Sequence, residues 1–164
     1  MQILARSSKQ HVRHGRADPL LRAFAATEYV VHARRGDIVV RIGHASPVLD
    51  RVLDGRSWTV ITAYNPNGVS RPSNDNAAAQ LELEQLLRES RPASMLPVSN
   101  HDPSGRWPDE PAWLVTCDQV FLLDELARRF GQLAVVTGRP GAPAALRIFS
   151  GSRDTGGIET VAIS

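Results

Sequence analysis

Four polar side chains surround one strand-turn-helix passage of this sequence. Tyr64 and Asn65 end an apolar run, Arg71 follows the turn, and Asn76 lies in the first turns of the next helix. Amide and phenol groups give directed hydrogen bonds, and a guanidinium group binds carboxylates and phosphates through two parallel bonds. The start of a helix adds free N–H groups and a partial positive charge. We therefore expect an anion-binding pocket here.

Two further residues complete the predicted ligand-binding set. Glu110 lies in a proline-rich segment directly before an apolar run, and Gln132 directly follows a glycine. We expect Glu110 to accept hydrogen bonds from Arg106 or Gln132, either as a structural contact or within the site. An alternative stays open, in which Asn65 only closes the turn and Asn76 only helps to cap the helix.

The sequence offers weaker support for other chemistry. His101 and Asp102 are adjacent and share an irregular segment with Glu110, but metal sites need three or four ligands at a recognisable spacing. We expect ordinary loop polarity there, and neither a metal nor a cofactor. No Gly-x-Ser-x-Gly elbow and no glycine-rich phosphate loop is present, so the sequence names no catalytic residue and leaves open whether the protein is an enzyme. His32 is expected to be packed or solvent-facing.

Composition predicts one soluble domain. The chain has 164 residues, of which 42% are hydrophobic, enough to build a core. No apolar run approaches the roughly 20 residues of a membrane helix, and the N-terminus lacks the apolar region of a secretory signal. Cys117 is the only cysteine, which excludes an internal disulfide and is typical of a buried, inert thiol. We expect a cytoplasmic protein with no membrane attachment.

Charge gives little support to a nucleic-acid partner. The net charge is +2, and all but one of the basic residues are arginines. An excess of arginine favours phosphate recognition, but a GC-rich genome produces it equally well. Residues 1–17 are basic, contain no acid and show no periodicity, so we expect a disordered arm. Weak nucleic-acid binding through this arm is one alternative function.

The elements that would position the site follow from local patterns. Residues 58–64 are mostly β-branched or aromatic, which predicts a central strand buried on both faces, and residues 65–68, Asn-Pro-Asn-Gly, fit a type I turn. The longest helix begins at residue 73 or 74. Its apolar stripe contains Ala79, Leu83, Leu86 and Leu87.

The second large helix is expected to follow a capping box from Thr116 to Gln119 and to end at Gly131. Its exposed face would pair Asp124 with Arg128, and Glu125 with Arg129.

Short helices should begin near residues 19 and 47, where an aspartate or serine precedes a proline. Hairpins are expected over residues 28–42 and 133–149. Residues 97–111 contain four prolines and a glycine, which is typical of a loop, so we expect no strand there beyond a brief one at 94–98.

These patterns predict a single α+β domain over residues 18–150, followed by a frayed tail at 151–164. Its sheet would be mixed, largely antiparallel and of five or six strands. Two larger helices would pack on one face, with two short helices near the N-terminus.

The order of motifs resembles a bacterial family known as domain of unknown function 3293. The resemblance covers about residues 27–149 and is carried by Thr27-x-Tyr29, Arg41-Ile42-Gly43, Ile61-Thr62-Ala63-Tyr64-Asn65-Pro66, Asn76, Gly105-Arg106-x-Pro108-x-Glu110-Pro111 and Arg129-Phe130-Gly131-Gln132. It implies a compact α+β protein and brings no activity. Ala112 departs from the small polar residue that the resemblance implies after the Glu-Pro pair.

Besides nucleic-acid binding, two functions remain open. The first is binding of a polar or anionic small molecule at the end of the central strand. The second is a regulatory or protein-interaction module that uses an exposed Trp107 and the proline-rich loop around it as a contact surface. The sequence assigns neither a ligand identity nor an oligomeric state.

Overall fold

The computed structural model describes residues 19–116, 118–150 and 157–161, and these form four α-helices, one 3-10 turn and eight strands. The first half of the chain contains α1 (Pro19–Ala26), β1 (Glu28–Ala33), β2 (Gly36–Val40), α2 (Pro47–Val52), β3 (Trp58–Ile61) and η1 (Pro66–Gly68). The second half contains α3 (Ser73–Glu89), β4 (Ser94–His101), β5 (Glu110–Thr116), α4 (Val120–Arg129), β6 (Ala134–Gly138), β7 (Ala145–Ser150) and β8 (Gly157–Val161). The expected basic arm and Cys117 lie outside these residues.

All eight strands belong to one sheet in the order β2-β1-β4-β5-β3-β6-β7-β8, and every pair of neighbouring strands is antiparallel. The predicted α+β class is confirmed. The predicted count of five or six strands is wrong, and none of the named pairs is parallel. β3 is an interior strand with all four residues buried, as its apolar sequence predicts, but it ends at Ile61 rather than at residue 64.

The extra strand length comes from two segments expected to be irregular. β4 continues through Pro97 as far as His101. The pairing of β1 with β4 ends at Val31 and Val98, so Pro97 is paired on one side only, with Trp113 of β5. Proline tolerates this position because its missing N–H points away from the paired strand. Residues 157–161, expected to fray, form β8 and pair with β7.

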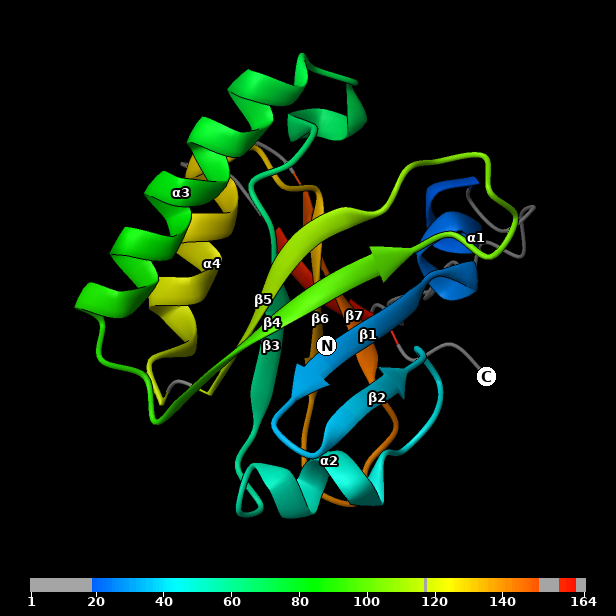
Figure 1. Cartoon of the computed structure of the whole chain (residues 1–164), viewed down its shortest axis with the longest axis vertical. Coiled ribbons are helices and arrows are strands. Elements are labelled where there is room, and N and C mark those ends of the chain that lie inside the picture. The colour runs from blue at the N-terminus through cyan, green and yellow to red at the C-terminus, as the bar shows by residue number, and fades with distance from the viewer. Residues whose placement is uncertain (1–18, 117, 151–156, 162–164) are drawn as a thin grey trace, which may run out of the picture.

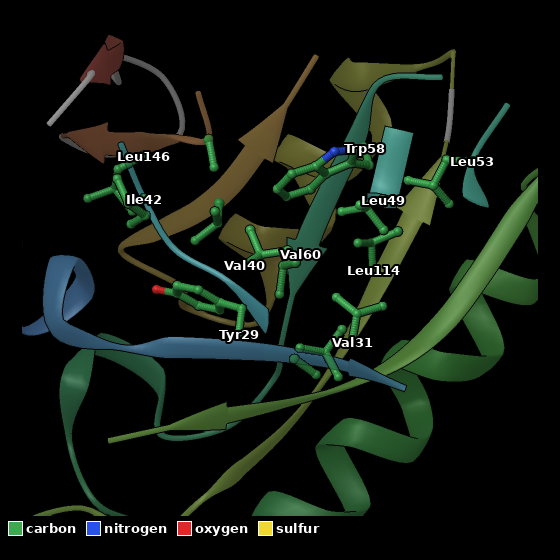
Figure 2. Packing of buried hydrophobic residues seen from close by; sticks show 14 of the residues in the cluster. Tyr29, Val31, Val40, Ile42, Leu49, Leu53, Trp58, Val60, Leu114 and Leu146 are labelled. Carbon is green, nitrogen blue, oxygen red and sulfur yellow. The ribbon is translucent and has the colours of Figure 1, made fainter. Parts of the chain in front are cut away.

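The sheet curls around an apolar interior. Gly43, just beyond β2, donates a 2.8 Å hydrogen bond to the carbonyl of Ala144, just before β7, and a parallel bridge joins Ile42 to Ala144. Figure 2 shows the side chains that fill the interior, among them Tyr29, Trp58 and Leu114. Leu49 of α2 and Leu53 just after it belong to the same cluster, so this short helix contributes to the interior. We call this the inner face of the sheet.

The outer face carries α3 and α4, which lie side by side in Figure 1. Strand residues alternate between the faces, so Val60 is in the inner cluster and Ile61 is in the outer one. Leu83 and Leu123, from α3 and α4, pack into that outer cluster. Each such fully buried aliphatic side chain stabilises the fold by roughly 2–3 kcal/mol. The prediction that both larger helices cover one face is confirmed.

The ion pairs predicted within α4 are wrong. Arg147 of β7 makes two hydrogen bonds to the buried carboxylate of Asp124, at 2.8 and 2.6 Å, which raises the pKa of this arginine above its ordinary value. Arg129 pairs instead with Glu82 of α3. Both acids are remote from their partners in sequence, so the i,i+4 spacing within the helix could not reveal them.

The expected capping box is also wrong. Thr116 is the last residue of β5, and its hydroxyl accepts a 2.7 Å bond from the N–H of Ser94 in the neighbouring strand. α4 begins four residues later, after Gln119, whose side chain makes no capping bond. Gly131 ends this helix region with φ +66, as predicted. None of the helices among the described residues combines the length and the apolar character needed to cross a membrane.

Candidate functional site

The turn after β3 is built on two asparagines with left-handed backbone. Asn65 has φ 46 and ψ 60, and Asn67 has φ 57 and ψ 22. Gly68 closes the turn by donating a 3.0 Å bond to the carbonyl of Asn65. A positive φ at the third turn position is a feature of type II turns, so the type I prediction is wrong. Asparagine tolerates this region better than most residues because its side chain bonds locally.

Asn65 and Asn76 form the centre of the site. The main-chain N–H of Asn65 donates to Oδ1 of Asn76 at 2.9 Å, and Nδ2 of Asn76 donates to Oδ1 of Asn65 at 2.9 Å. Oδ1 of Asn65 also accepts a 3.0 Å bond from the N–H of Arg71. Asn76 is only 4% exposed, so this network fixes α3 to the end of β3.

Glu110 joins the same network from β5. Nδ2 of Asn65 donates a 2.5 Å bond to its Oε1. The expected donors were Arg106 or Gln132, and that expectation is wrong. Arg106 bonds to the hydroxyl of Ser104 instead.

Gln132 holds the turn from the other side. Its Nε2 donates to the carbonyl of Tyr64 at 3.0 Å and to that of Phe130 at 3.3 Å. The N–H of Asn67 donates a 2.7 Å bond to the carbonyl of Gly131. The end of α4 is therefore tied to the turn after β3, although about 65 residues of chain separate them.

Thr62 and Gln80 belong to this network and were missed by the sequence analysis. Oε1 of Gln80 accepts the N–H of Ala63 at 2.8 Å and the hydroxyl of Thr62 at 3.3 Å. Gln80 is 8% exposed, and its Nε2 is buried without a partner among the described residues. A signal was present: Asn76 and Gln80 continue the inward stripe of Leu83 and Leu87 along α3. Polar residues at inward helix positions indicate a buried polar contact.

A groove of about 690 Å³ lies beside this network, between the first half of α3 and the end of α4. In Figure 1 the η1 turn lies next to the N-terminal end of α3 at this point. The groove is lined by Ala63, Pro66, Asn67, Arg71, Asp75, Ala78, Ala79, Glu82, Arg128, Arg129, Phe130 and Gly131. Of the six predicted site residues, Arg71 is in this lining. Tyr64, Asn65, Asn76, Glu110 and Gln132 bond to one another or to the turn that forms one wall.

The charges in the groove are unequally balanced. Three arginines and two acids line it, a surplus of one positive charge. Arg129 is paired with Glu82. Within the described parts of the chain, neither Arg71 nor Arg128 has an acidic partner, although Arg128 lies 5.1 Å from the ring centre of Phe149.

Asp102 organises the loop between β4 and β5. The carboxylate of Asp102 accepts bonds from the N–H groups of Ser104, Arg106 and Trp107 and from the hydroxyl of Ser104. These bonds, that of the hydroxyl first, hold the pKa of Asp102 below its ordinary value. Trp107 is 62% exposed, as the sequence predicts.

His101 lies beside this loop and does not pair with Asp102. It bonds to Asp109 at 2.7 Å, and this bond raises the pKa of His101. No group of three or more histidine, cysteine or acidic side chains able to hold a metal occurs among the described residues.

A second cavity, of about 380 Å³, lies at the opposite end of β3. Trp58, Thr137, Gly138 and Arg139 contribute to its wall. It contains none of the residues that the sequence analysis selected.

Comparison with known proteins finds one family model that matches part of the chain. Residues 61–135 match the family model described as "Protein of unknown function (DUF3293)", a shorter span than the resemblance suggested. Neither the curated proteins nor the solved structures contain a match to the chain. The matched span runs from the end of β3 into β6 and contains all six predicted site residues. Over this span, just under half of the chain, the sequence is similar to the DUF3293 family.

Proposed function

We propose that the groove between α3 and α4 binds a small polar or anionic molecule at the end of β3. The observation that carries the proposal is that Arg71 and Arg128 line one groove and have no acidic partner among the described residues. An arginine held near the protein surface without a counter-ion favours a negatively charged ligand, because the guanidinium group binds carboxylate or phosphate through two bonds.

The dimensions of the groove support a ligand of metabolite size. Its volume of about 690 Å³ falls within the range of sites that hold small molecules. The first turn of α3 adds a partial positive charge near Arg71. Asp75 in that same turn opposes it, so a ligand that carries both an anionic group and a hydrogen-bond donor fits better than a simple anion.

In this proposal the polar network acts by holding the wall of the groove. Asn65, Asn76 and Glu110 use their bonding groups on one another, and Tyr64 and Gln132 fix the turn from the α4 side. Pro66 and Asn67, which line the groove, are thereby held in place. A ligand would then contact Arg71 directly and depend on the other five residues for the shape of its site.

Thermal unfolding in the presence of three probes tests the proposal: inorganic phosphate, succinate and glycerol. A probe at ten times its Kd raises the free energy of unfolding by about 1.4 kcal/mol, which is a Tm increase of roughly 3–6 °C for a chain of this size. We expect phosphate or succinate to produce such an increase and glycerol to produce none.

Variants locate the binding site. Arg71→Ala combined with Arg128→Ala should abolish the increase, and Asn65→Ala combined with Glu110→Ala should weaken it through the turn. Arg34→Ala, in the exposed β1–β2 loop, is the control and should respond like the parent. If the double arginine variant responds as the parent does, or if none of the probes stabilises the parent, the proposal is wrong.

A second candidate function is supported by the loop that presents Trp107. Asp102 fixes the backbone on both sides of Arg106, and the indole is left 62% exposed. A rigid, exposed aromatic side chain costs little entropy when it enters a partner's pocket. We propose it as the anchor of a protein-interaction surface, to be tested by recovering partners with the parent and with Trp107→Ala. A partner set that is unchanged by the substitution argues against it.

We further propose that the protein acts in the bacterial cytoplasm. A single cysteine supports this, because small secreted domains commonly rely on several disulfides. The nucleic-acid alternative depends on residues 1–17, which lie outside the described residues, and a mobility shift that weakens as salt rises would support it.

A further inference from the structure

Three side chains on the outer face of β1, β2 and β4 form a hydrogen-bonded chain that the groove does not use. Nδ1 of His32 lies 2.9 Å from Oδ1 of Asp37, and Nε2 of the same ring lies 2.9 Å from Oγ of Ser99. Asp37 is directly opposite His32 in the antiparallel ladder, and Ser99 is opposite Val30, two residues away on the same face. The sequence separation of 67 residues between His32 and Ser99 explains why no local motif indicates this arrangement.

Sheet geometry determines that these groups point outward together. Val31, Val40 and Val98 are in the inner cluster. Their chain neighbours His32, Val39 and Ser99 therefore lie on the other face, and Asp37 shares the parity of Val39. Val39 is 41% exposed, so this part of the face is open to solvent.

The hydrogen-bond pattern sets the tautomer of His32. A carboxylate only accepts hydrogen bonds, so Nδ1 of His32 carries the ring proton and donates it in a hydrogen bond to Asp37. Nε2 is then left with a lone pair directed at the hydroxyl of Ser99. The neighbouring charges on this face are engaged elsewhere, since Arg41 pairs with Glu28 and His101 pairs with Asp109.

A hydroxyl that donates to an imidazole oriented by a carboxylate is the arrangement of an activated nucleophile. We propose that Ser99 accepts an acyl group from activated esters, with His32 as the base and Asp37 as the residue that positions it. Oγ of Ser99 attacks the ester carbonyl, and its proton passes to Nε2 of His32. The new Oγ–C bond replaces the C–O bond to the leaving group, which departs with the proton held by His32.

The open surroundings determine what kind of reactivity to expect. His32 and Asp37 side chains are 40% and 59% exposed, so water screens their interaction. Because the site does not exclude water, we expect slow, selective modification of Ser99 and not rapid turnover. A covalent adduct is therefore the appropriate measurement.

A fluorophosphonate is a suitable probe, because attack by Oγ forms an O–P bond, fluoride leaves, and the proton again passes to His32. The full chain is incubated with the probe, and adducts are counted by intact mass and located by peptide mapping. We expect one adduct, on Ser99, formed at least tenfold faster than any adduct on the exposed Ser70. Ser99→Ala should abolish it, and Ser70→Ala should leave its rate unchanged.

Two further variants separate activation from simple exposure. His32→Ala should slow labelling at least tenfold, with partial recovery on addition of imidazole. Asp37→Asn, which has the same size and should keep the fold by circular dichroism, should slow labelling severalfold. Labelling of Ser99 that is no faster than that of Ser70, or a rate unchanged in both His32→Ala and Asp37→Asn, overturns the proposal.

Discussion

Asn65 and Asn76 bind one another in both directions: Asn76 accepts the main-chain N–H of Asn65 and donates its own amide to the Asn65 side chain. The two residues lie on either side of the turn that leads from β3 to α3. Their exchange of bonds ties the start of the longest helix to the end of an interior strand. The orientation of that helix, and with it one side of the groove, therefore depends on two side-chain amides.

Replacement of Asn76 by alanine should destabilise the protein. It removes both bonds to Asn65 and leaves the main-chain N–H of Asn65 without its acceptor. The site is buried, since Asn76 is only 4% exposed. An orphaned buried group costs roughly 1–3 kcal/mol, so we expect a Tm decrease of about 2–12 °C. Asn74→Ala, exposed on the same helix, should change stability by less than about 0.5 kcal/mol. Equal effects of both substitutions would contradict the role assigned to Asn76.

A pair of glycine substitutions isolates the contact between α4 and the turn. Gly131 and Gly141 have similar positive φ values, +66 and +71. A Cβ on Gly131 would lie 2.7 Å from Cβ of Pro66, whereas one on Gly141 would meet nothing within 4 Å. Both alanine variants should lose about 1–2 kcal/mol to backbone strain. Gly131→Ala should lose at least about 1 kcal/mol more through overpacking, as measured by urea unfolding.

If the two glycine variants unfold at the same urea concentration, Pro66 moves to accommodate the extra carbon. The contact between Gly131 and the turn is then not rigid. The same pair also provides a control for the ligand tests. Gly131→Ala moves the wall that Pro66 and Asn67 form, whereas Gly141→Ala leaves it in place.

Loss of the Asp124 carboxylate should have a large effect. Asp124 is 3% exposed in its side chain and binds Arg147 through both oxygens, so Asp124→Asn leaves an unpaired cation against the core. The 24% exposure of Arg147 lets water compensate in part, and we expect a loss of about 2–3 kcal/mol rather than the larger values of fully buried pairs.

Arg147→Lys keeps the charge but loses the two-bond geometry, and should fall between the parent and Asp124→Asn. Glu125→Gln, its exposed neighbour in α4, should unfold like the parent in urea. A comparable loss from Glu125→Gln would indicate that α4 responds to any change of charge.

Tyr29 should make stability fall in strong alkali. Burial raises the pKa of its hydroxyl well above the ordinary value, and the charge of Glu110 adds to this. Because the folded pKa is raised, the contribution of Tyr29 is fully present below about pH 10, where the unfolded residue titrates, and is lost as pH rises towards the folded value. We expect unfolding free energy to decrease by up to about 1.4 kcal/mol per pH unit above pH 10 from this residue.

Urea unfolding from pH 8 to 11, compared with Tyr29→Phe, measures that contribution. The variant keeps the ring but cannot ionise, so its stability should fall less steeply over the same interval. Parallel curves for the two proteins would show that Tyr29 does not titrate differently on unfolding.

The loop that carries Trp107 should loosen in acid. The folded pKa of Asp102 is lowered, so its bonds to the loop are present above the ordinary pKa of an aspartate and are lost as pH falls through the folded value. Amide hydrogen exchange of Ser104, Arg106 and Trp107 should become faster, relative to the intrinsic rate, in Asp102→Ala. Ser104→Ala should accelerate it less, since the main-chain bonds remain. Unchanged exchange in Asp102→Ala would show that another contact orders the loop.

The sequence predicted those parts of the site that depend on neighbours in the chain. Asn65 and Asn76 belong to one strand-turn-helix passage, so composition and turn chemistry were enough to bring them together. Glu110 was selected, but its partner was not, because the contact with Asn65 depends on how β5 aligns with β3.

Long-range choices account for the errors in the fold. Pro97 lies in β4 just past Val98, where the pairing with β1 ends, and no local pattern shows where that pairing ends. Asp124 could pair with Arg128, four residues later in sequence, or with Arg147 of β7. The position of β7 in the sheet brings Arg147 to the carboxylate. The pairing of His32 with Ser99 depends on register in the same way.

The contact between Ile42 and Ala144 has a consequence for the protein in concentrated solution. An edge strand with unsatisfied peptide groups recruits strands of other chains, and this is a common start of aggregation. Beyond β2 those groups are already bound within the molecule, through Gly43 and His44 to Ala144. At that edge of the sheet, the peptide groups that another chain could pair with are therefore limited to the five residues of β2.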